Sequence, residues 1–168
     1  MNNSDKENLL KFIMGRFDPY YESINNKGNV YLTLNTFILG GVLAGYFWVR
    51  QQIKLECTHD YLLIIFLVFN LFSISTTLLA LKPYLKSYAK TSKSILFFND
   101  IASIQLTDFI IKIENIDENK INEDLVSQVY LLAKGLRRKF LLLNISTWII
   151  GLEIITIIIF GFLILNTI

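Results

Sequence analysis

Three long runs of residues with almost no charge constrain the fold more than any other feature of the chain. They cover residues 30–49, 61–81 and 141–165, and Glu153 is the single charged residue in them. A helix needs about 20 mostly apolar residues to cross the hydrocarbon core of a bilayer. Three strands cannot close a barrel, so only helices satisfy the backbone polar groups of these runs in lipid. We therefore expect an all-α membrane protein with three transmembrane helices.

The distribution of charge predicts the orientation of these spans. The residues outside the three runs carry 29 of the 30 charged side chains of the chain. Of the Lys and Arg residues in the segments that flank the spans, twelve would face one side of the membrane and only Arg50 and Lys54 the other. Because Lys and Arg gather on the cytoplasmic side, the sequence predicts a cytoplasmic N-terminus and a C-terminus on the opposite side.

The counts of cysteine and histidine exclude several classes of function. Cys57 and His59 are the only residues of their kinds. One of each cannot form a disulfide scaffold, a Cys/His zinc site or a catalytic pair, and both are expected to be ordinary residues of the loop between the first two spans. A net charge of +2 also argues against nucleic-acid binding by bulk charge. We expect no enzyme, no metal, no cofactor and no nucleic-acid partner.

The residues before the first span have the pattern of an amphipathic helix over residues 4–24. Asp18 and Pro19 are expected to kink or restart it, and residues 25–29 to form a turn just before the membrane. The apolar stripe of this helix has two interpretations. It lies on the bilayer surface, or it packs on the other helices inside the cell.

Residues 82–140 are expected to form a cytosolic helical region within one domain covering residues 1–168. Pro83 ends or kinks the second span, and residues 84–93 form a basic anchor. Residues 94–133 carry a net charge of −5. A short helix capped by Thr107 or Asp108 is expected within them. No proline occurs from Asn122 onward, so one helix is predicted from about 122 to 165, continuous from the cytosol into the membrane.

Two features inside the spans have more than one interpretation. Gly41 and Gly45 form a GxxxG motif, which allows close helix contact either within one chain or between copies. Glu153 is either a carboxyl that lines or gates a pore, or a carboxyl hydrogen-bonded to polar residues of neighbouring spans. The candidate partners are Asn35, Asn70, Ser73, Ser75 and Thr76.

Three segments resemble the PycTM domain family, the transmembrane effectors of Pycsar anti-phage systems. Residues 17–41 are similar to the family's approach to its first span, and residues 122–140 to its acidic helix start and the basic run into the last span. Residues 94–103, SILFFNDIAS, resemble a signature of two aromatics, a small residue, Asp and a small apolar pair. Asn99 stands where the family has glycine, and Gly28 where it has alanine.

The resemblance implies a function that the composition does not. In these systems a partner cyclase senses phage infection and makes cyclic CMP or cyclic UMP. The effector, as a homo-oligomer in the bacterial inner membrane, then impairs the bilayer and causes abortive infection. A nucleotide site is implied near the family signature, where aromatics could stack a base and arginines could meet a phosphate. The implied residues are Phe97, Phe98, Asn99, Asp100, Arg137 and Arg138.

Other interpretations stay open from the residues alone. The aromatics of the signature could fill the core, and the arginines could lie at lipid headgroups. The chain could also be a small constitutive channel or transporter subunit that uses Glu153. A third possibility is a membrane anchor or scaffold, whose inside helices dock a partner.

Overall fold

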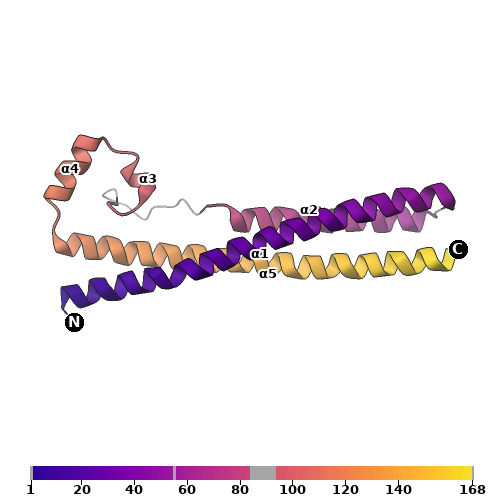
Figure 1. Cartoon of the computed structure of the whole chain (residues 1–168), viewed down its shortest axis with the longest axis horizontal. Coiled ribbons are helices and arrows are strands. Elements are labelled where there is room, and N and C mark those ends of the chain that lie inside the picture. Colours follow the sequence, from indigo (N-terminus) through magenta and orange to yellow (C-terminus); the bar gives the residue numbers. More distant parts are fainter. Residues whose placement is uncertain (1, 55, 84–93, 168) are drawn as a thin grey trace. The chain divides into compact units, whose positions relative to one another are not determined.

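The computed structural model describes residues 2–54, 56–83 and 94–167, which are mostly helical (Figure 1). The helices are α1 (Asn3–Gln52), α2 (Cys57–Leu81), α3 (Phe98–Ile101), α4 (Leu106–Glu114) and α5 (Glu118–Thr167). No strand occurs in this part of the chain. Three of the helices, α1, α2 and α5, are long and apolar enough to cross a membrane. The expected all-α membrane fold with three spans is therefore confirmed.

The chain divides into two compact units. We call Ile24–Lys82 with Lys139–Ile168 the membrane unit, because it contains the three apolar runs, and Met1–Ser23 with Pro83–Arg138 the polar unit. Helices α1 and α5 contribute residues to both units. Each unit therefore combines segments that are far apart in the sequence.

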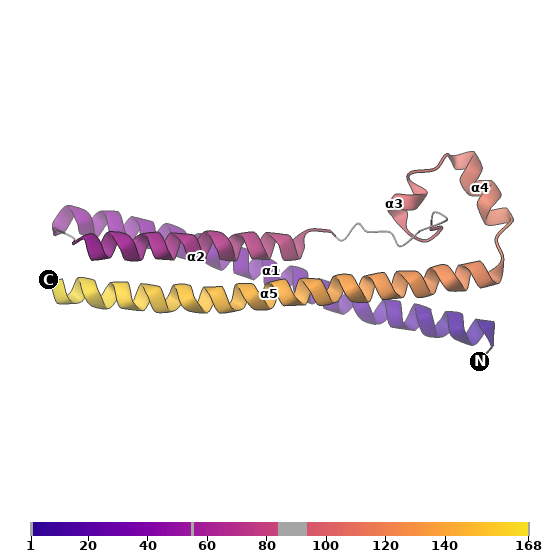
Figure 2. The ribbon, with the colours of Figure 1, turned by 180° about the vertical axis from the view of Figure 1, so that it is seen from behind.

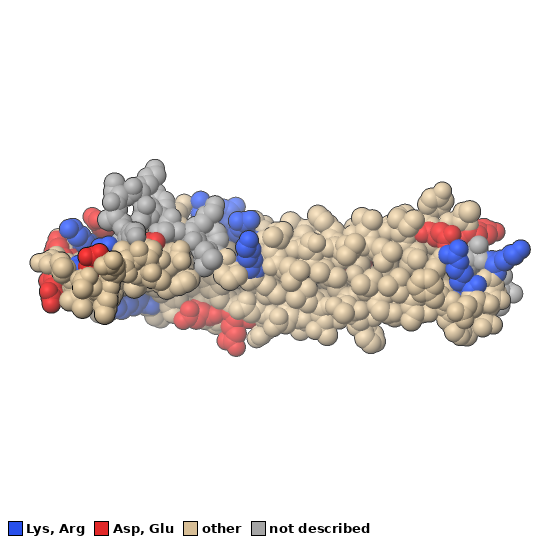
Figure 3. Space-filling view, turned by 90° about the horizontal axis from the view of Figure 1, so that it is seen from above, with Lys and Arg blue, Asp and Glu red and all other residues tan. Residues whose placement is uncertain are grey.

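In the membrane unit, segments of α1 and α5 lie beside α2, as the two opposite views show (Figures 1 and 2). Tyr31 on α1 shares a hydrogen bond of 2.8 Å with Thr147 on α5. Large apolar side chains such as Phe37 and Trp148 point outward and are 79% and 74% exposed. The face in Figure 3 has a broad band without charged side chains. An apolar outer surface of this kind is what lipid requires of a spanning bundle.

In the polar unit, the first part of α1 packs on the first part of α5. Leu10 of α1 and Leu125 and Leu136 of α5 are buried. The Tyr21 hydroxyl of α1 donates a hydrogen bond of 2.8 Å to the Leu132 carbonyl of α5. Of the two interpretations of the stripe in residues 4–24, the structure thus gives packing on another helix. Helices α3 and α4 have no buried residue.

Helix α1 runs without a break where the sequence predicted a kink and a turn. It includes Pro19 and residues 25–29, so the predicted restart at Pro19 and the predicted turn are wrong. The buried positions Leu10, Ile24, Gly28 and Asn35 follow one another in steps of fourteen, four and seven residues, which keeps them on one helical face. Packing of this continuous stripe outweighs the local turn preference of Asn and Gly and the one backbone donor that proline lacks.

The other helix boundaries agree with the sequence in part. Helix α2 ends at Leu81, two residues before Pro83. It begins at Cys57, so the expectation that Cys57 and His59 lie in a loop is wrong. Helix α4 follows Gln105 rather than Thr107 or Asp108. The predicted long helix is confirmed as α5 and starts four residues before Asn122. The basic anchor at residues 84–93 lies outside the described residues.

Candidate functional site

The interior of the membrane unit contains a cluster of polar side chains contributed by all three helices. Among the described residues, six polar side chains have 0% exposure. They are Asn35 on α1, Asn70, Ser73 and Thr77 on α2, and Ser146 and Glu153 on α5. Buried polar residues are costly at membrane depth and mark functional or helix-joining positions.

Asn70 connects the three helices at the level of Glu153. Its amide nitrogen donates to Glu153 Oε2 and to the backbone carbonyl of Asn35, each at 3.2 Å. Of the candidate partners for Glu153, the structure therefore gives Asn70. Ser75 is exposed, and both Ser75 and Thr76 use their hydroxyls on carbonyls of their own helix.

A chain of hydroxyl groups continues from Asn35. The Asn35 amide nitrogen donates to Ser73 Oγ at 2.8 Å. Ser146 Oγ shares hydrogen bonds with Ser73 Oγ at 3.1 Å and with Thr77 Oγ1 at 2.7 Å. Hydrogen bonds of this kind between transmembrane helices contribute about 0.6 to 2 kcal/mol each. The cluster is thus one connected network across the bundle.

The network has more acceptors than donors around Glu153. Asn35 Oδ1, Asn70 Oδ1 and Glu153 Oε1 are buried and accept no hydrogen bond from the described residues. No Lys or Arg of this part of the chain pairs with Glu153. A buried acceptor without a donor costs about 1 to 3 kcal/mol, so three on neighbouring residues are unusual.

At one end of the membrane unit, Lys139 holds the last turn of α2. Its side chain is 7% exposed, and its amine donates to the carbonyls of Ala80 at 2.6 Å and Leu81 at 3.3 Å. Burial lowers the pKa of this amine. A cation beside the free carbonyls of a helix C-terminus is favourable. Lys139 is the last residue of the basic run before the third apolar run, and it is buried whereas Arg137 and Arg138 are exposed.

Helix α1 also meets α2 at this end. A Cβ atom added at Gly28 would lie 2.6 Å from Leu81 Cδ2, closer than real Cβ contacts allow. Glycine at this position therefore lets α1 approach the side chain of Leu81.

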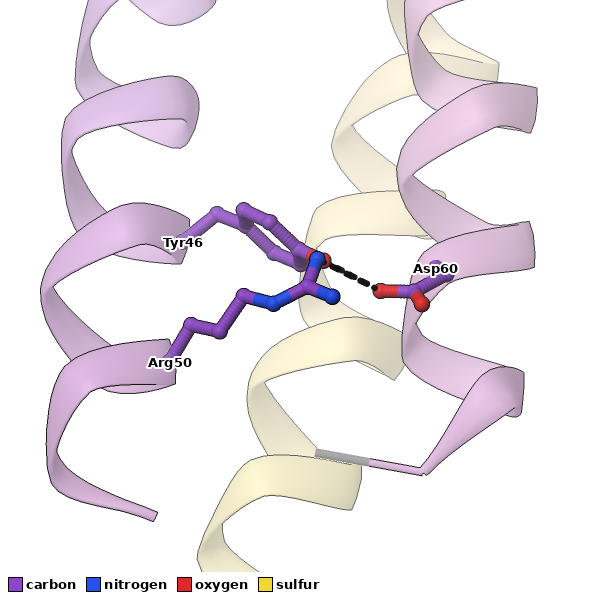
Figure 4. Close-up of polar contacts among 3 residues, drawn as sticks. All are labelled: Tyr46, Arg50 and Asp60. Carbon is purple, nitrogen blue, oxygen red and sulfur yellow. Dashed lines mark hydrogen bonds and ion pairs between the residues drawn. The ribbon is translucent and has the colours of Figure 1, made fainter. Parts of the chain in front are cut away.

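Three polar side chains form a second cluster where the C-terminus of α1 lies near the N-terminus of α2 (Figure 4). We call this the α1–α2 end of the membrane unit. The Tyr46 hydroxyl donates to the Asp60 carboxylate and accepts from Arg50 Nη1 at 2.5 Å. Arg50 and Asp60 also form an ion pair of 3.4 Å. Both charged groups are about half exposed, so the ion pair itself adds at most about 1 kcal/mol. Sequence reasoning used these charges only to orient the chain.

His59 lies beside this second cluster in an apolar contact. It is 3% exposed, and its ring packs edge-on against Phe160 with centroids 6.0 Å apart. Neither ring nitrogen has a hydrogen-bond partner in the described structure. Phe160 also lies 6.2 Å from the Tyr46 ring. The only histidine is therefore an interior residue, which its position between Cys57 and Asp60 did not indicate.

A small apolar cavity separates the two polar clusters. Its lining includes Phe66 and Phe160, together with Val42 and Thr156. Phe66 is one turn of α2 from Asn70, and Thr156 is one turn of α5 from Glu153. We call the apolar side chains of Val42, Phe66 and Phe160 the apolar collar.

In the polar unit, the segment that carries the family signature is held by two carboxylates. Asp124 Oδ2 accepts from Ser94 Oγ at 2.8 Å and from the backbone amides of Ile95 and Leu96 at 2.9 and 3.2 Å. Asp100 Oδ2 accepts from the Ser94 amide at 2.9 Å. Ser94 Oγ in turn accepts from the Phe97 amide at 2.9 Å. Asp124 was missed because its partners lie 28 to 30 residues away.

The predicted nucleotide residues fall on this segment and on α5. The Phe97 and Phe98 rings are 5.1 Å apart, and Phe98 is 63% exposed, so Phe98 does not fill a core. Asn99 is exposed as well. Arg137 and Arg138 are exposed, and no contact joins either to the aromatic pair in the part of the chain that the structure describes.

The GxxxG glycines face outward. Gly41 and Gly45 are exposed, and a Cβ atom added at either would meet nothing within 4 Å. The motif therefore makes no close contact with another described helix of its own chain. Contact between copies is the interpretation that stays open.

Comparison with known proteins gives one family over nearly the whole chain. The family model PycTM, described as the Pycsar effector protein domain, matches residues 9–166. The chain is similar to the Pycsar effector protein SaPycTM of Staphylococcus aureus, with 26% identity over 135 residues. The aligned region covers 80% of this chain and 81% of that protein. No solved structure matches the chain.

Proposed function

Because the chain belongs to the Pycsar effector family, we propose that a cyclic pyrimidine mononucleotide switches it from a closed to a membrane-damaging state. Family membership makes it an anti-phage defence effector, with three helices that can span a membrane. The proposed ligand is cyclic CMP or cyclic UMP, made by a partner cyclase, and the proposed outcome is loss of inner-membrane integrity and abortive infection. The family match over residues 9–166 carries this proposal, because it includes both units.

The membrane unit is the proposed actuator. Its interior holds polar side chains that lipid cannot solvate, while its outer surface is apolar. In the closed form these polar groups are joined to one another across helices. If activation separates the helices, the same groups become available to water and ions. The unit thus needs only a change of helix packing to let polar solutes into the bilayer.

The polar unit is the proposed sensor. The exposed ring of Phe98 and the exposed Asn99 offer a stacking surface and a polar group for a base. Arg137 and Arg138 are exposed cations that can meet a cyclic phosphate. Asp100 and Asp124 act as positioning residues, because they hold the backbone of residues 94–96.

Assembly of several copies is part of the proposal. The outward-facing Gly41 and Gly45 allow two copies of α1 to approach closely. The proposed orientation places the polar unit in the cytoplasm, where the cyclase acts, and the end of α5 on the other side.

The test compares matched charge variants in cells with an active partner cyclase. Arg137→Gln combined with Arg138→Gln should abolish ligand-triggered depolarisation, as should Phe97→Leu combined with Phe98→Leu. The control is Lys11→Gln combined with Arg16→Gln, which removes two exposed cations elsewhere in the polar unit and should change nothing.

Binding of cyclic CMP and cyclic UMP to the detergent-purified chain completes the test. The wild type and the control should bind one of the two nucleotides, and the sensor variants should not. If both sensor variants bind and depolarise like the wild type, the sensor lies elsewhere.

A further inference from the structure

The polar network of the membrane unit lacks hydrogen-bond donors at one place. The three oxygen atoms without donors come from three helices, Asn35 Oδ1 on α1, Asn70 Oδ1 on α2 and Glu153 Oε1 on α5. The Asn70 amide nitrogen touches both other residues, so the three belong to one cluster. No histidine, lysine or arginine of the described chain is bonded to this cluster.

A single proton on Glu153 reduces this shortage, because it adds one donor to the cluster and removes the need for a donor at one carboxyl oxygen. A protonated carboxyl gains an O–H donor, whereas the ionised form only accepts. It also removes a buried negative charge for which the described residues provide no counter-ion. Neutral Glu153 therefore suits both the hydrogen bonding and the burial of the closed bundle.

We propose that Glu153, with Asn35 and Asn70, is the proton-binding site of the effector, and that the activated membrane unit carries protons across the bilayer. This inference rests on the proposed function and names the permeant ion of the same actuator. In the closed state Glu153 keeps its proton. In the activated state its O–H bond breaks toward one end of the bundle, and a new O–H bond forms with a proton that arrives from the other end.

Polar groups that can pass a proton lie on both sides of the cluster. Toward the Lys139 end, the hydroxyls of Ser73, Thr77 and Ser146 are joined to Asn35 by hydrogen bonds. Lys139 is the titratable group at that end. Chains of this kind serve as proton relays in membrane proteins.

Toward the α1–α2 end, the apolar collar interrupts the path. His59, Tyr46, Asp60 and Arg50 are the titratable groups beyond it, and neither ring nitrogen of His59 has a hydrogen-bond partner among the described residues. The collar includes Phe66 and borders a cavity whose lining is apolar except for Thr156. An apolar constriction between polar regions gates conduction by excluding water. Its hydration is the step that ligand-triggered helix movement would supply.

The experiment uses the purified full chain in liposomes that contain a pH-sensitive dye, with cyclic CMP and cyclic UMP added in turn. The wild type should collapse a proton gradient when the activating nucleotide is added, without releasing an entrapped anionic dye. Glu153→Gln keeps the shape and the hydrogen-bonding capacity of the side chain but cannot exchange a proton. It should lose the proton flux and keep nucleotide binding, while Glu153→Asp should recover part of the flux.

Two controls separate misfolding from mechanism. Glu114→Gln makes the same chemical change at an exposed position of α4 and should leave the flux unchanged. An infrared band of a protonated carboxylic acid should appear in the resting wild type at neutral pH and be absent from Glu153→Gln. Absence of that band from the wild type would overturn the proposal, because Glu153 would then be ionised at rest.

The outcomes distinguish this inference from the proposed function. If the activating nucleotide releases the entrapped dye and protons equally in the wild type and in Glu153→Gln, the effector damages membranes without a proton site and the inference is overturned. If neither nucleotide changes the permeability of wild-type liposomes in any way, the proposed function fails, and the inference fails with it.

Discussion

The two units share the buried helical period of α5 but differ in how deeply they bury polar side chains. In the polar unit, α5 buries Leu125, Leu131 and Leu136 together with Asn122 and Gln128, and neither polar side chain is fully buried. In the membrane unit, the same helix buries Leu143, Ile149 and Ile150 together with Lys139, Ser146 and Glu153, which recur at intervals of seven residues, and Ser146 and Glu153 have 0% exposure. The outer surface changes in the opposite sense, because the large exposed side chains of the membrane unit are apolar.

The difference follows from the solvent of each unit. In water, apolar side chains associate because burial removes them from water. In lipid, an apolar side chain gains little from moving between the bilayer and the protein, so helices associate through close packing and polar contacts. A seven-residue pattern thus indicates which face is buried. Whether that face is apolar or polar depends on the medium around the helix.

A topology experiment tests most directly which unit lies in water and which in lipid. A reporter that is active only outside the cytoplasm should be active when fused after Ile168 and inactive when fused after Lys93. The physical reason is the asymmetry of Lys and Arg around the spans. The control is a reporter that is active only in the cytoplasm, which should give the reverse pattern at the same two positions. Activity outside after Lys93 would place the polar unit on the wrong side for a cytosolic ligand.

The next largest effect concerns two carboxyls, the half-buried Asp124 of the polar unit and the buried Glu153 of the membrane unit. Asp124 accepts three hydrogen bonds in the polar unit, whereas Glu153 accepts one, so only Asp124 is supplied with donors. Asp124→Ala should destabilise the segment around Ile95 by about 2 to 3 kcal/mol, because three donors, two of them in part-buried hydrogen bonds, lose a charged acceptor. Hydrogen exchange at the amides of Ile95 and Leu96 should become faster.

The adjacent residue provides the control for that experiment. Glu123 is exposed, so Glu123→Ala should leave exchange at these amides unchanged. Equal protection in the wild type and in Asp124→Ala would mean that Asp124 does not hold the segment.

A smaller effect is expected from two glycines of α1, one in each unit. A Cβ at Gly15 would meet nothing within 4 Å, whereas at Gly28 it would press on Leu81. Gly15→Ala should therefore gain the helix propensity of alanine, about 1 kcal/mol. Gly28→Ala must also displace Leu81, and overpacking costs about 1 to 3 kcal/mol. In detergent, the unfolding temperature of Gly15→Ala should be higher than that of the wild type. The unfolding temperature of Gly28→Ala should be lower than that of Gly15→Ala. Equal gains would show that Leu81 moves freely.

The sequence predicted the features that depend on long, regular patterns. The spans and the length of α5 follow from apolar runs and from the absence of proline after Asn122. Local signals were weaker guides, since Pro19 and residues 25–29 are helical despite their turn preference. The roles of Lys139 and Asp124 depend on contacts with segments distant in sequence, so no local pattern reveals them. The seven-residue interval from Lys139 to Ser146 and Glu153 was the one available signal for the buried cation.

The smallest expected effect is the dependence of stability on pH that Lys139 introduces. Burial lowers the pKa of its amine from the ordinary value of 10.5, so the unfolded chain holds this proton at pH values where the folded chain has begun to lose it. Stability rises with pH wherever the unfolded state binds more protons. The Lys139 contribution should therefore increase as the pH rises through the window between the lowered pKa and 10.5, and stay flat well below that window.

Lys139→Met isolates this contribution. It keeps an unbranched side chain without a titratable amine, so its unfolding temperature in detergent should lack the part of the alkaline trend that Lys139 supplies. The stability of the wild type relative to the variant should improve as the pH approaches the ordinary lysine value. Lys134→Met is the matched control, because Lys134 is exposed in the polar unit and its removal should leave the trend of the wild type intact. Parallel curves for the wild type and Lys139→Met would mean that Lys139 exchanges its proton as freely as an exposed lysine. The amine would then not be buried beneath the last turn of α2. At this residue, the contrast between the buried polar groups of the membrane unit and the exposed ones of the polar unit would not hold.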